Sequence, residues 1–149
     1  MRCYTGRVAP TARRGGREDV LETGVDIVEI ERVASLVRRY GERFRDRVYT
    51  EREWADCAGR AESLAARFAA KEATIKALGS REPALHEIEV VRPADSRPRL
   101  RLHGRAADVA RRAGVRELSL SLSHGREHAI AMVVAVCDGE PPPWLGESS

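Results

Sequence analysis

The sequence predicts an α+β fold in which a small, mostly antiparallel sheet packs against one long helix. Helical periodicity dominates the first half of the chain, and its longest helix, over about 62–78, is built from strong helix formers. The second half consists mainly of short strand-like segments joined by hairpin-like turns. Helices that come first, followed by such strands, indicate an α+β domain.

The first half begins with a short strand over 23–30, which is rich in β-branched residues. A helix over 31–40 follows, because apolar side chains recur there at helical spacing with arginines around the outside. Thr50 has a glutamate three residues after it, a capping-box pattern that predicts the start of another short helix. The long helix then ends at Gly79, because glycine suits the position just after a helix.

The second half is predicted to contain four strands and one helix. The segment LSLSLS alternates leucine with serine, so its strand should have one apolar face and one hydroxylated face. The segment HGRE after it is typical of a turn into an apolar final strand. The predicted strands span 87–91, 98–104, 118–123 and 128–137, and the helix spans 104–114.

The length of 149 residues suits one domain with its own core. We expect this domain over 21–137, because the Arg-rich residues 1–20 and the Pro-rich residues 138–149 have the composition of disordered tails. No apolar run approaches the length of a membrane span, and the start of the chain lacks the apolar stretch of a signal peptide. A cytoplasmic protein is therefore expected.

The charge distribution argues against a nucleic-acid-binding domain. The formal charge of +3 is carried by residues 1–20, which hold five arginines against two acids, and the rest of the chain has 21 basic and 21 acidic residues. A basic domain needs a net field to attract phosphates, so any anion site here must be local.

Cysteine usage argues against both a disulfide framework and a structural zinc site. Cys3, Cys57 and Cys137 are odd in number, far apart and without CxxC spacing. We expect three free thiols.

The long helix carries an unusual row of side chains, because steps of four give Leu64, Phe68, Glu72 and Lys76. Glu72 and Lys76 are either an ordinary ion pair on an exposed helix or charged groups near a ligand. Asp26 also has two interpretations, as an exposed residue of the first strand or as part of a ligand site, since it lies between two apolar residues. Two acids amid apolar neighbours make a hard-oxygen site of the kind that takes Mg²⁺ together with phosphates and water.

Other charged or polar side chains have two interpretations each. Arg67 and Lys71 are four residues apart on a flank of the long helix. They are either solvated surface charges or anchors for a polyphosphate ligand. His124 ends the serine-faced strand, where it is either structural or part of a phosphate site together with Ser123.

Three segments resemble, in the same order, the signature blocks of the holo-[acyl-carrier-protein] synthase family of 4′-phosphopantetheinyl transferases. They are GVDIVEIER at 24–32, RFAAKEATIKALG at 67–79, and SLSH followed by HAIAMVV within 121–134. The resemblance covers about residues 22–137 and implies the family's fold. It also implies the family's reaction, the Mg²⁺-dependent transfer of 4′-phosphopantetheine from coenzyme A to a serine of an apo acyl carrier protein, with release of adenosine 3′,5′-bisphosphate.

The resemblance implies roles for the charged residues of the first two blocks. Asp26 and Glu72 match the two metal ligands, and Lys76 matches a lysine near the reacting phosphates. Glu72 and Lys76 are thus the implied catalytic residues, with Glu72, or a water that it orients, accepting the serine proton.

Further roles concern the two substrates. The resemblance implies that the nucleotide part of coenzyme A contacts Arg67, Lys71, Ser123 and His124, and that the carrier protein contacts Arg32. Acyl carrier proteins are acidic, and the helix over 31–40 can present arginines to an acidic surface. The candidates on this helix or just after it are Arg32, Arg38, Arg39 and Arg43.

Small members of the family are homotrimers with sites shared between subunits, so the resemblance implies a trimer here. The chain also departs from the family in two places. Residues 80–84 (SREPA) replace the usual short Thr-Gly turn, and Gly125 stands where some members have an acidic residue. The altered loop leaves an alternative open: a non-catalytic module of the same fold that binds coenzyme A or a carrier protein.

Overall fold

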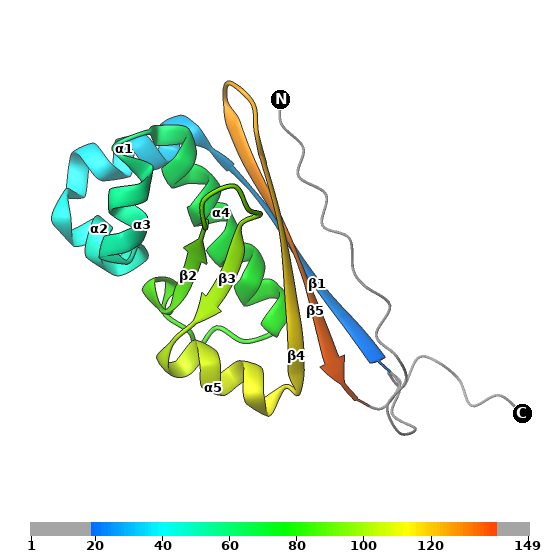
Figure 1. The fold of residues 1–149 in the computed structure, drawn as a ribbon. Helices are drawn as coiled ribbons and strands as arrows, with labels where there is room; N and C mark the ends of the chain where they lie inside the picture. Colours follow the sequence, from blue (N-terminus) through cyan, green and yellow to red (C-terminus); the bar gives the residue numbers. More distant parts are fainter. Residues whose placement is uncertain (1–18, 140–149) are drawn as a thin grey trace, which may run out of the picture.

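A three-stranded antiparallel sheet of order β1-β5-β4 carries the long helix α4 on one face (Figure 1). On its other side α4 contacts α1, α3 and β2, and β2 pairs with β3 in a separate two-stranded sheet. The computed structural model describes residues 19–139. Its elements are β1 (Asp19–Glu29), α1 (Ile30–Tyr40), α2 (Glu42–Val48), α3 (Glu51–Cys57), α4 (Ala61–Leu78), the 3₁₀ helix η1 (Leu85–Glu87), β2 (Ile88–Val91), β3 (Arg99–Leu102), α5 (Gly104–Arg112), β4 (Val115–His124) and β5 (His128–Asp138).

The strand register gives the three-stranded sheet two different faces. In β4 the three leucines of LSLSLS turn toward α4 and the three serines turn away, because Leu120 pairs with the buried Val133 whereas Ser123 pairs with the exposed Ile130. This confirms the predicted apolar and hydroxylated faces. The face away from α4 exposes a row of large apolar side chains from β1 and β5: Leu21, Val25, Ile27, Ile130 and Met132.

Gly24 sets the distance between β1 and α4. A Cβ atom at this position would lie 1.9 Å from the Ala73 carbonyl oxygen and 2.8 Å from the Ala77 amide nitrogen, so no side chain fits. The helix also presents only small side chains to the sheet at this point, because Ala73 and Ala77 are buried there. Strand and helix backbones therefore touch directly, and charged side chains just beyond this contact are brought within reach of each other.

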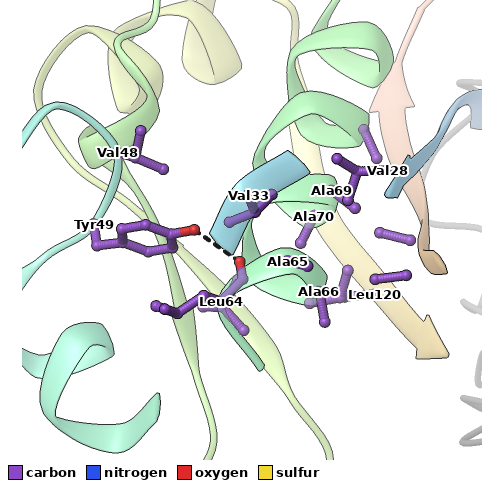
Figure 2. Close-up of a cluster of buried hydrophobic side chains, with 14 of the residues drawn as sticks. Val28, Val33, Val48, Tyr49, Leu64, Ala65, Ala66, Ala69, Ala70 and Leu120 are labelled. Carbon is purple, nitrogen blue, oxygen red and sulfur yellow. Dashed lines mark hydrogen bonds between the residues drawn. The ribbon is translucent and has the colours of Figure 1, made fainter. Parts of the chain in front are cut away.

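The other side of α4 packs on the turns between the first helices. Figure 2 shows Tyr49 and Val48 beside Leu64, with the Tyr49 hydroxyl donating a hydrogen bond to the Leu64 carbonyl oxygen at 2.8 Å. Val33 of α1 completes this part of the core and is fully buried. Burial raises the pKa of Tyr49, so its hydroxyl is a neutral donor in this contact.

The structure confirms the predicted α+β class and every predicted element to within a few residues. The capping box at Thr50 is present, since its hydroxyl accepts a hydrogen bond from the Glu53 amide and the Glu53 carboxylate accepts one from the Thr50 amide. Two short elements, α2 and η1, were not predicted. Among the described residues, Cys57 and Cys137 are free and buried, as expected, and Cys3 lies outside them.

The strand β1 begins at Asp19 and β5 ends at Asp138, slightly beyond the predicted domain bounds of 21 and 137. The rest of the predicted tails, 1–18 and 140–149, lies outside the described residues. Within 19–139 no helix is long and apolar enough to cross a lipid bilayer.

Gly24→Ala should lower the free energy of unfolding by more than about 2 kcal/mol, because the added methyl group overlaps the backbone of α4 and forces strand and helix apart. Chemical denaturation followed by circular dichroism measures this loss. Gly125→Ala is the matched control, since a Cβ atom there meets nothing within 4 Å. Equal stability of the two variants would show that β1 and α4 do not touch as described.

Candidate active site

The Asp26 carboxylate and the Lys76 ammonium group meet where β1 crosses α4. Lys76 Nζ lies 3.0 Å from Asp26 Oδ1 and donates a second hydrogen bond to the Val25 carbonyl oxygen at 2.9 Å. The Asp26 side chain is 18% exposed and the Lys76 side chain is 53% exposed, so the pair lies at the surface. The two residues are far apart in the chain and are adjacent because Gly24 allows the close approach of strand and helix.

Glu72 lies one helical turn before Lys76, close enough to Asp26 for the two charges to interact, and these two residues are called the carboxylate pair. Partial burial raises the pKa of Glu72, and the negative charge of Asp26 raises it further. The positive charges of Lys76, Arg32 and Arg81 oppose this shift. The helical row from Leu64 to Lys76 therefore runs from the core to the surface, and its charged end faces a second carboxylate.

This carboxylate pair has the donor chemistry of a site for a hard divalent cation. Two carboxylates held together repel each other, and a cation between them relieves that repulsion. Mg²⁺ commonly takes one or two protein carboxylates and completes its shell with water and phosphate oxygens. Within 19–139 no group of three or more His, Cys, Asp or Glu side chains is arranged to hold a metal ion.

The Lys71 side chain points into the interior of the domain and not toward this site, although nucleotide binding was predicted for it. Its side chain is 0% exposed, and Nζ donates hydrogen bonds to Glu53 Oε2 at 2.8 Å and to the carbonyl oxygens of Leu85 and Ile88. An ammonium group has three hydrogens, so none is left for a phosphate. Burial lowers the pKa of Lys71, and the Glu53 carboxylate opposes that shift.

Glu53 is the anion that makes the burial of Lys71 possible. Its side chain is 0% exposed, and Oε1 accepts a hydrogen bond from the Val90 amide at 2.9 Å while Oε2 accepts one from the Thr50 amide at 2.9 Å. The buried pair thus joins α3, α4 and β2. Lys71 therefore anchors α4 at the position directly before Glu72.

Lys71→Met should lower the free energy of unfolding by about 3–5 kcal/mol, because it leaves the Glu53 carboxylate buried without a cation. The double variant Glu53→Gln/Lys71→Met removes both charges and should recover part of the loss. Denaturant titration of both proteins checks this. A stable single variant would mean that Lys71 Nζ is not held in the interior.

Arg67 is also largely buried but lacks the full set of partners that Lys71 has. The residue is 8% exposed, and its Nε atom has no hydrogen-bond partner within the described part of the chain. Burial raises the pKa of Cys57, and the Arg67 guanidinium partly offsets this, which places the two groups close together. A buried donor without an acceptor is costly, so an incoming anionic oxygen would stabilise Arg67.

Ser123 and His124 line a groove at the turn between β4 and β5, away from the carboxylate pair. Ser123 and Ile27 both pair with Ile130 and so share the exposed face of the sheet, whereas Asp26 pairs with Ala131 on the face toward α4. The groove has a volume of about 500 Å³ and is lined by Ile27, Ser123, His124, Gly125, Arg126, His128 and Ile130. Within one chain, Ser123 therefore lies on one face of the three-stranded sheet, and the predicted metal ligands Asp26 and Glu72 lie on the side of α4.

The four arginines proposed for carrier binding are all exposed on α1 and α2. Arg38 forms an ion pair with Glu31, and the Arg39 guanidinium lies 5.3 Å from the centre of the Tyr40 ring. Arg32 and Arg43 have no ion pair within the described residues. Arg32 is also one of the cations that lower the pKa of Glu72, so this helix reaches the edge of the carboxylate pair.

Residues 22–133 match the 4′-phosphopantetheinyl transferase superfamily. The chain belongs to this superfamily. Similar proteins include the holo-[acyl-carrier-protein] synthase of Herpetosiphon aurantiacus, 48% identical over 126 residues that cover 78% of this chain and 99% of that protein. The holo-[acyl-carrier-protein] synthase of Chloroflexus aurantiacus is 50% identical over 134 residues, covering 78% of this chain and 98% of that protein.

Solved structures of the same superfamily share this fold. The Helicobacter pylori holo-[acyl-carrier-protein] synthase in complex with coenzyme A matches with a TM-score of 0.69 and 32% identity over 76% of this chain and 98% of that chain. The coenzyme A complex of the synthase from Chronobacterium ammoniagenes matches with a TM-score of 0.70 and 32% identity over 81% of this chain and 99% of that chain.

Sequence reasoning missed the roles of Glu53 and Arg81. Glu53 was seen only as part of a capping box, because its second role depends on a lysine 18 residues away. Arg81 was seen only as part of an altered loop, although its charge lowers the pKa of Glu72. No local pattern identifies either role, since both arise from tertiary contacts.

Proposed function

We propose that this chain is a holo-[acyl-carrier-protein] synthase, which transfers 4′-phosphopantetheine from coenzyme A to a serine of an apo acyl carrier protein. The observation that carries this conclusion is the carboxylate pair of Asp26 and Glu72 with Lys76 beside it, on the two segments that the family resemblance singled out. The high identity to synthases over nearly their whole length supports it.

The reaction is a phosphoryl transfer, so the protein has mainly to align the groups and neutralise charge. The carrier serine oxygen bonds to the phosphorus of the phosphopantetheine, and the bond from that phosphorus to the bridging oxygen breaks. Lys76 is placed to stabilise the adenosine 3′,5′-bisphosphate that leaves with this oxygen. Glu72, or a water that it orients, accepts the serine proton, and its raised pKa makes it a stronger base than an exposed glutamate.

We further propose that Asp26 and Glu72 hold Mg²⁺ as the cofactor. The like-charge repulsion between the two carboxylates supports this assignment. When bound, the cation would neutralise charge on the diphosphate of coenzyme A. For the nucleotide part we propose Arg67, Ser123 and His124, of which Arg67 has an unsatisfied buried nitrogen atom.

We also propose a homotrimer with active sites shared between subunits, because the two faces of the three-stranded sheet differ. The exposed apolar row on β1 and β5, with Ile27 63% and Met132 49% exposed, has the composition of a surface that a second subunit covers. Ser123 lies on this exposed face and Asp26 on the other. A site that uses both residues is therefore best completed by Ser123 and His124 from a neighbouring subunit.

Mixing two inactive variants tests this sharing. Asp26→Ala and His124→Ala chains, unfolded together and refolded, should regain part of the activity, because mixed trimers contain sites in which both halves are intact. Each variant refolded alone is the control. Activity that stays at the level of the separate variants would place both residues in a site within one subunit.

The acidic carrier protein is proposed to dock on the exposed arginines of α1 and α2, including Arg32 and Arg43. This surface adjoins the carboxylate pair, since the charge of Arg32 acts on Glu72. A docked carrier could thus bring its serine to the reacting phosphate. A cytoplasmic location is part of the same proposal.

The function is tested by the mass of an apo acyl carrier protein incubated with the protein, coenzyme A and Mg²⁺, which should increase by one phosphopantetheine group. Asp26→Ala and Glu72→Ala should each lower the rate by at least about 100-fold, because each removes a carboxylate from the reacting centre. Asp108→Ala, which removes an exposed carboxylate on α5, is the control. Binding of coenzyme A or carrier without any mass increase would favour a non-catalytic binding module.

A further inference from the structure

A second groove lies at the end of the domain where α4 ends and β1 begins. It has a volume of about 340 Å³, and its walls come from β1, the end of α4, the segment that joins α5 to β4, and the end of β5 (Figure 1). Its lining includes Val20, Glu22, Lys76, Leu78, Ala113 and Val115. Of these six residues only Lys76 belongs to the candidate active site, so the groove borders that site and extends beyond it.

The second groove continues the candidate active site along β1. Side chains two residues apart in a strand share one face, so Val20 and Glu22 lie on the same face of β1 as Gly24 and Asp26, the face toward α4. Lys76 connects the two places, because its Nζ atom lies 3.0 Å from Asp26 Oδ1 and the same residue lines the groove. β1 is also an edge strand of its sheet. A ligand held at Asp26 can therefore extend along this edge into the groove.

The walls of the second groove are largely apolar and include one unpaired carboxylate. Leu78 is buried, and Val20 and Val115 are half-buried. Glu22 is exposed, and within residues 19–139 its carboxylate forms no ion pair, so it is free to accept a hydrogen bond from a ligand. Apolar walls with few polar groups suit a mostly apolar ligand, and the negative charge of Glu22 disfavours an anionic one.

The two ends of coenzyme A differ in the same way as the two grooves. Its diphosphate joins an adenosine 3′-phosphate, which is anionic, to a pantetheine arm, which is neutral, partly apolar and carries amide N–H groups. The groove at Ser123 and His124 also contains Arg126 and so suits the anionic end. The second groove, with its apolar walls and Glu22, suits the neutral arm. A diphosphate at the carboxylate pair and Lys76 would leave the arm next to this groove.

We propose that the second groove binds the pantetheine arm of coenzyme A. Val20, Leu78 and Val115 contact its apolar part, and the Glu22 carboxylate accepts a hydrogen bond from one of its amide N–H groups. This inference rests on the proposed function, because the arm is part of its substrate. An arm bound there would help to hold the phosphorus that is attacked beside Lys76 while the bond to the leaving group breaks.

The test compares the affinities of the full-length protein for coenzyme A and for adenosine 3′,5′-bisphosphate, which lacks the arm, by isothermal titration calorimetry with Mg²⁺. Ala113→Trp adds an indole ring at an exposed position of the groove. It should lower the ratio of the coenzyme A affinity to the bisphosphate affinity by about ten-fold or more, because the ring competes with the arm. Glu22→Ala should lower this ratio by about three-fold, and charge effects common to both ligands cancel in it.

Ala55→Trp is the matched control, because it adds the same ring at an exposed position of α3 and should leave the ratio unchanged. An unchanged ratio in both groove variants, with wild-type protein that still modifies the carrier, would overturn this inference and leave the proposed function standing. Equal weakening of both ligands would assign the groove to the nucleotide part or to stability, and would equally overturn it. A wild-type protein that binds no coenzyme A would overturn both the inference and the proposed function.

Discussion

The direct contact between the backbones of β1 and α4 is the constraint on which the rest of this structure depends. Glycine at position 24 and alanine at 73 leave no side chain between the strand and the helix. Two residues farther along the strand, Asp26 emerges beside the helical turn that holds Glu72 and Lys76. A larger residue at position 24 would separate groups that must share one ligand, so a packing requirement and a chemical requirement meet at a single position.

The opposite side of the same helix is held by a buried ion pair. Lys71 is adjacent in sequence to Glu72 but points into the core, where Glu53 neutralises it and two carbonyl oxygens accept its remaining hydrogens. Replacing such a pair with apolar residues often costs little, so its stability alone does not explain it. We attribute its value to position: it joins α3, α4 and the segment after α4, and so supports Glu72.

Much of this account could be predicted from the sequence, for physical reasons that also explain the failures. Periodicity and capping are local, so the helix row ending in Glu72 and Lys76 and the capping box at Thr50 were found. Charged residues among apolar neighbours also identified Asp26. The inward direction of Lys71 was not predicted, because an i,i+4 pair with Arg67 looks the same whether it faces water or the core. The sequence did not predict that Ser123 and Asp26 lie on opposite faces of the sheet, because local residue spacing does not determine the register between strands.

The central claim is that Asp26 and Glu72 together hold one divalent cation against the diphosphate of coenzyme A. The most direct measurement is a crystal structure with coenzyme A and Mn²⁺, in which anomalous scattering locates the metal independently of the protein. We predict one strong peak with an oxygen of each carboxylate at about 2.1 Å and with diphosphate oxygens in the remaining positions. A metal bound by only one of these carboxylates, or by neither, would contradict the account.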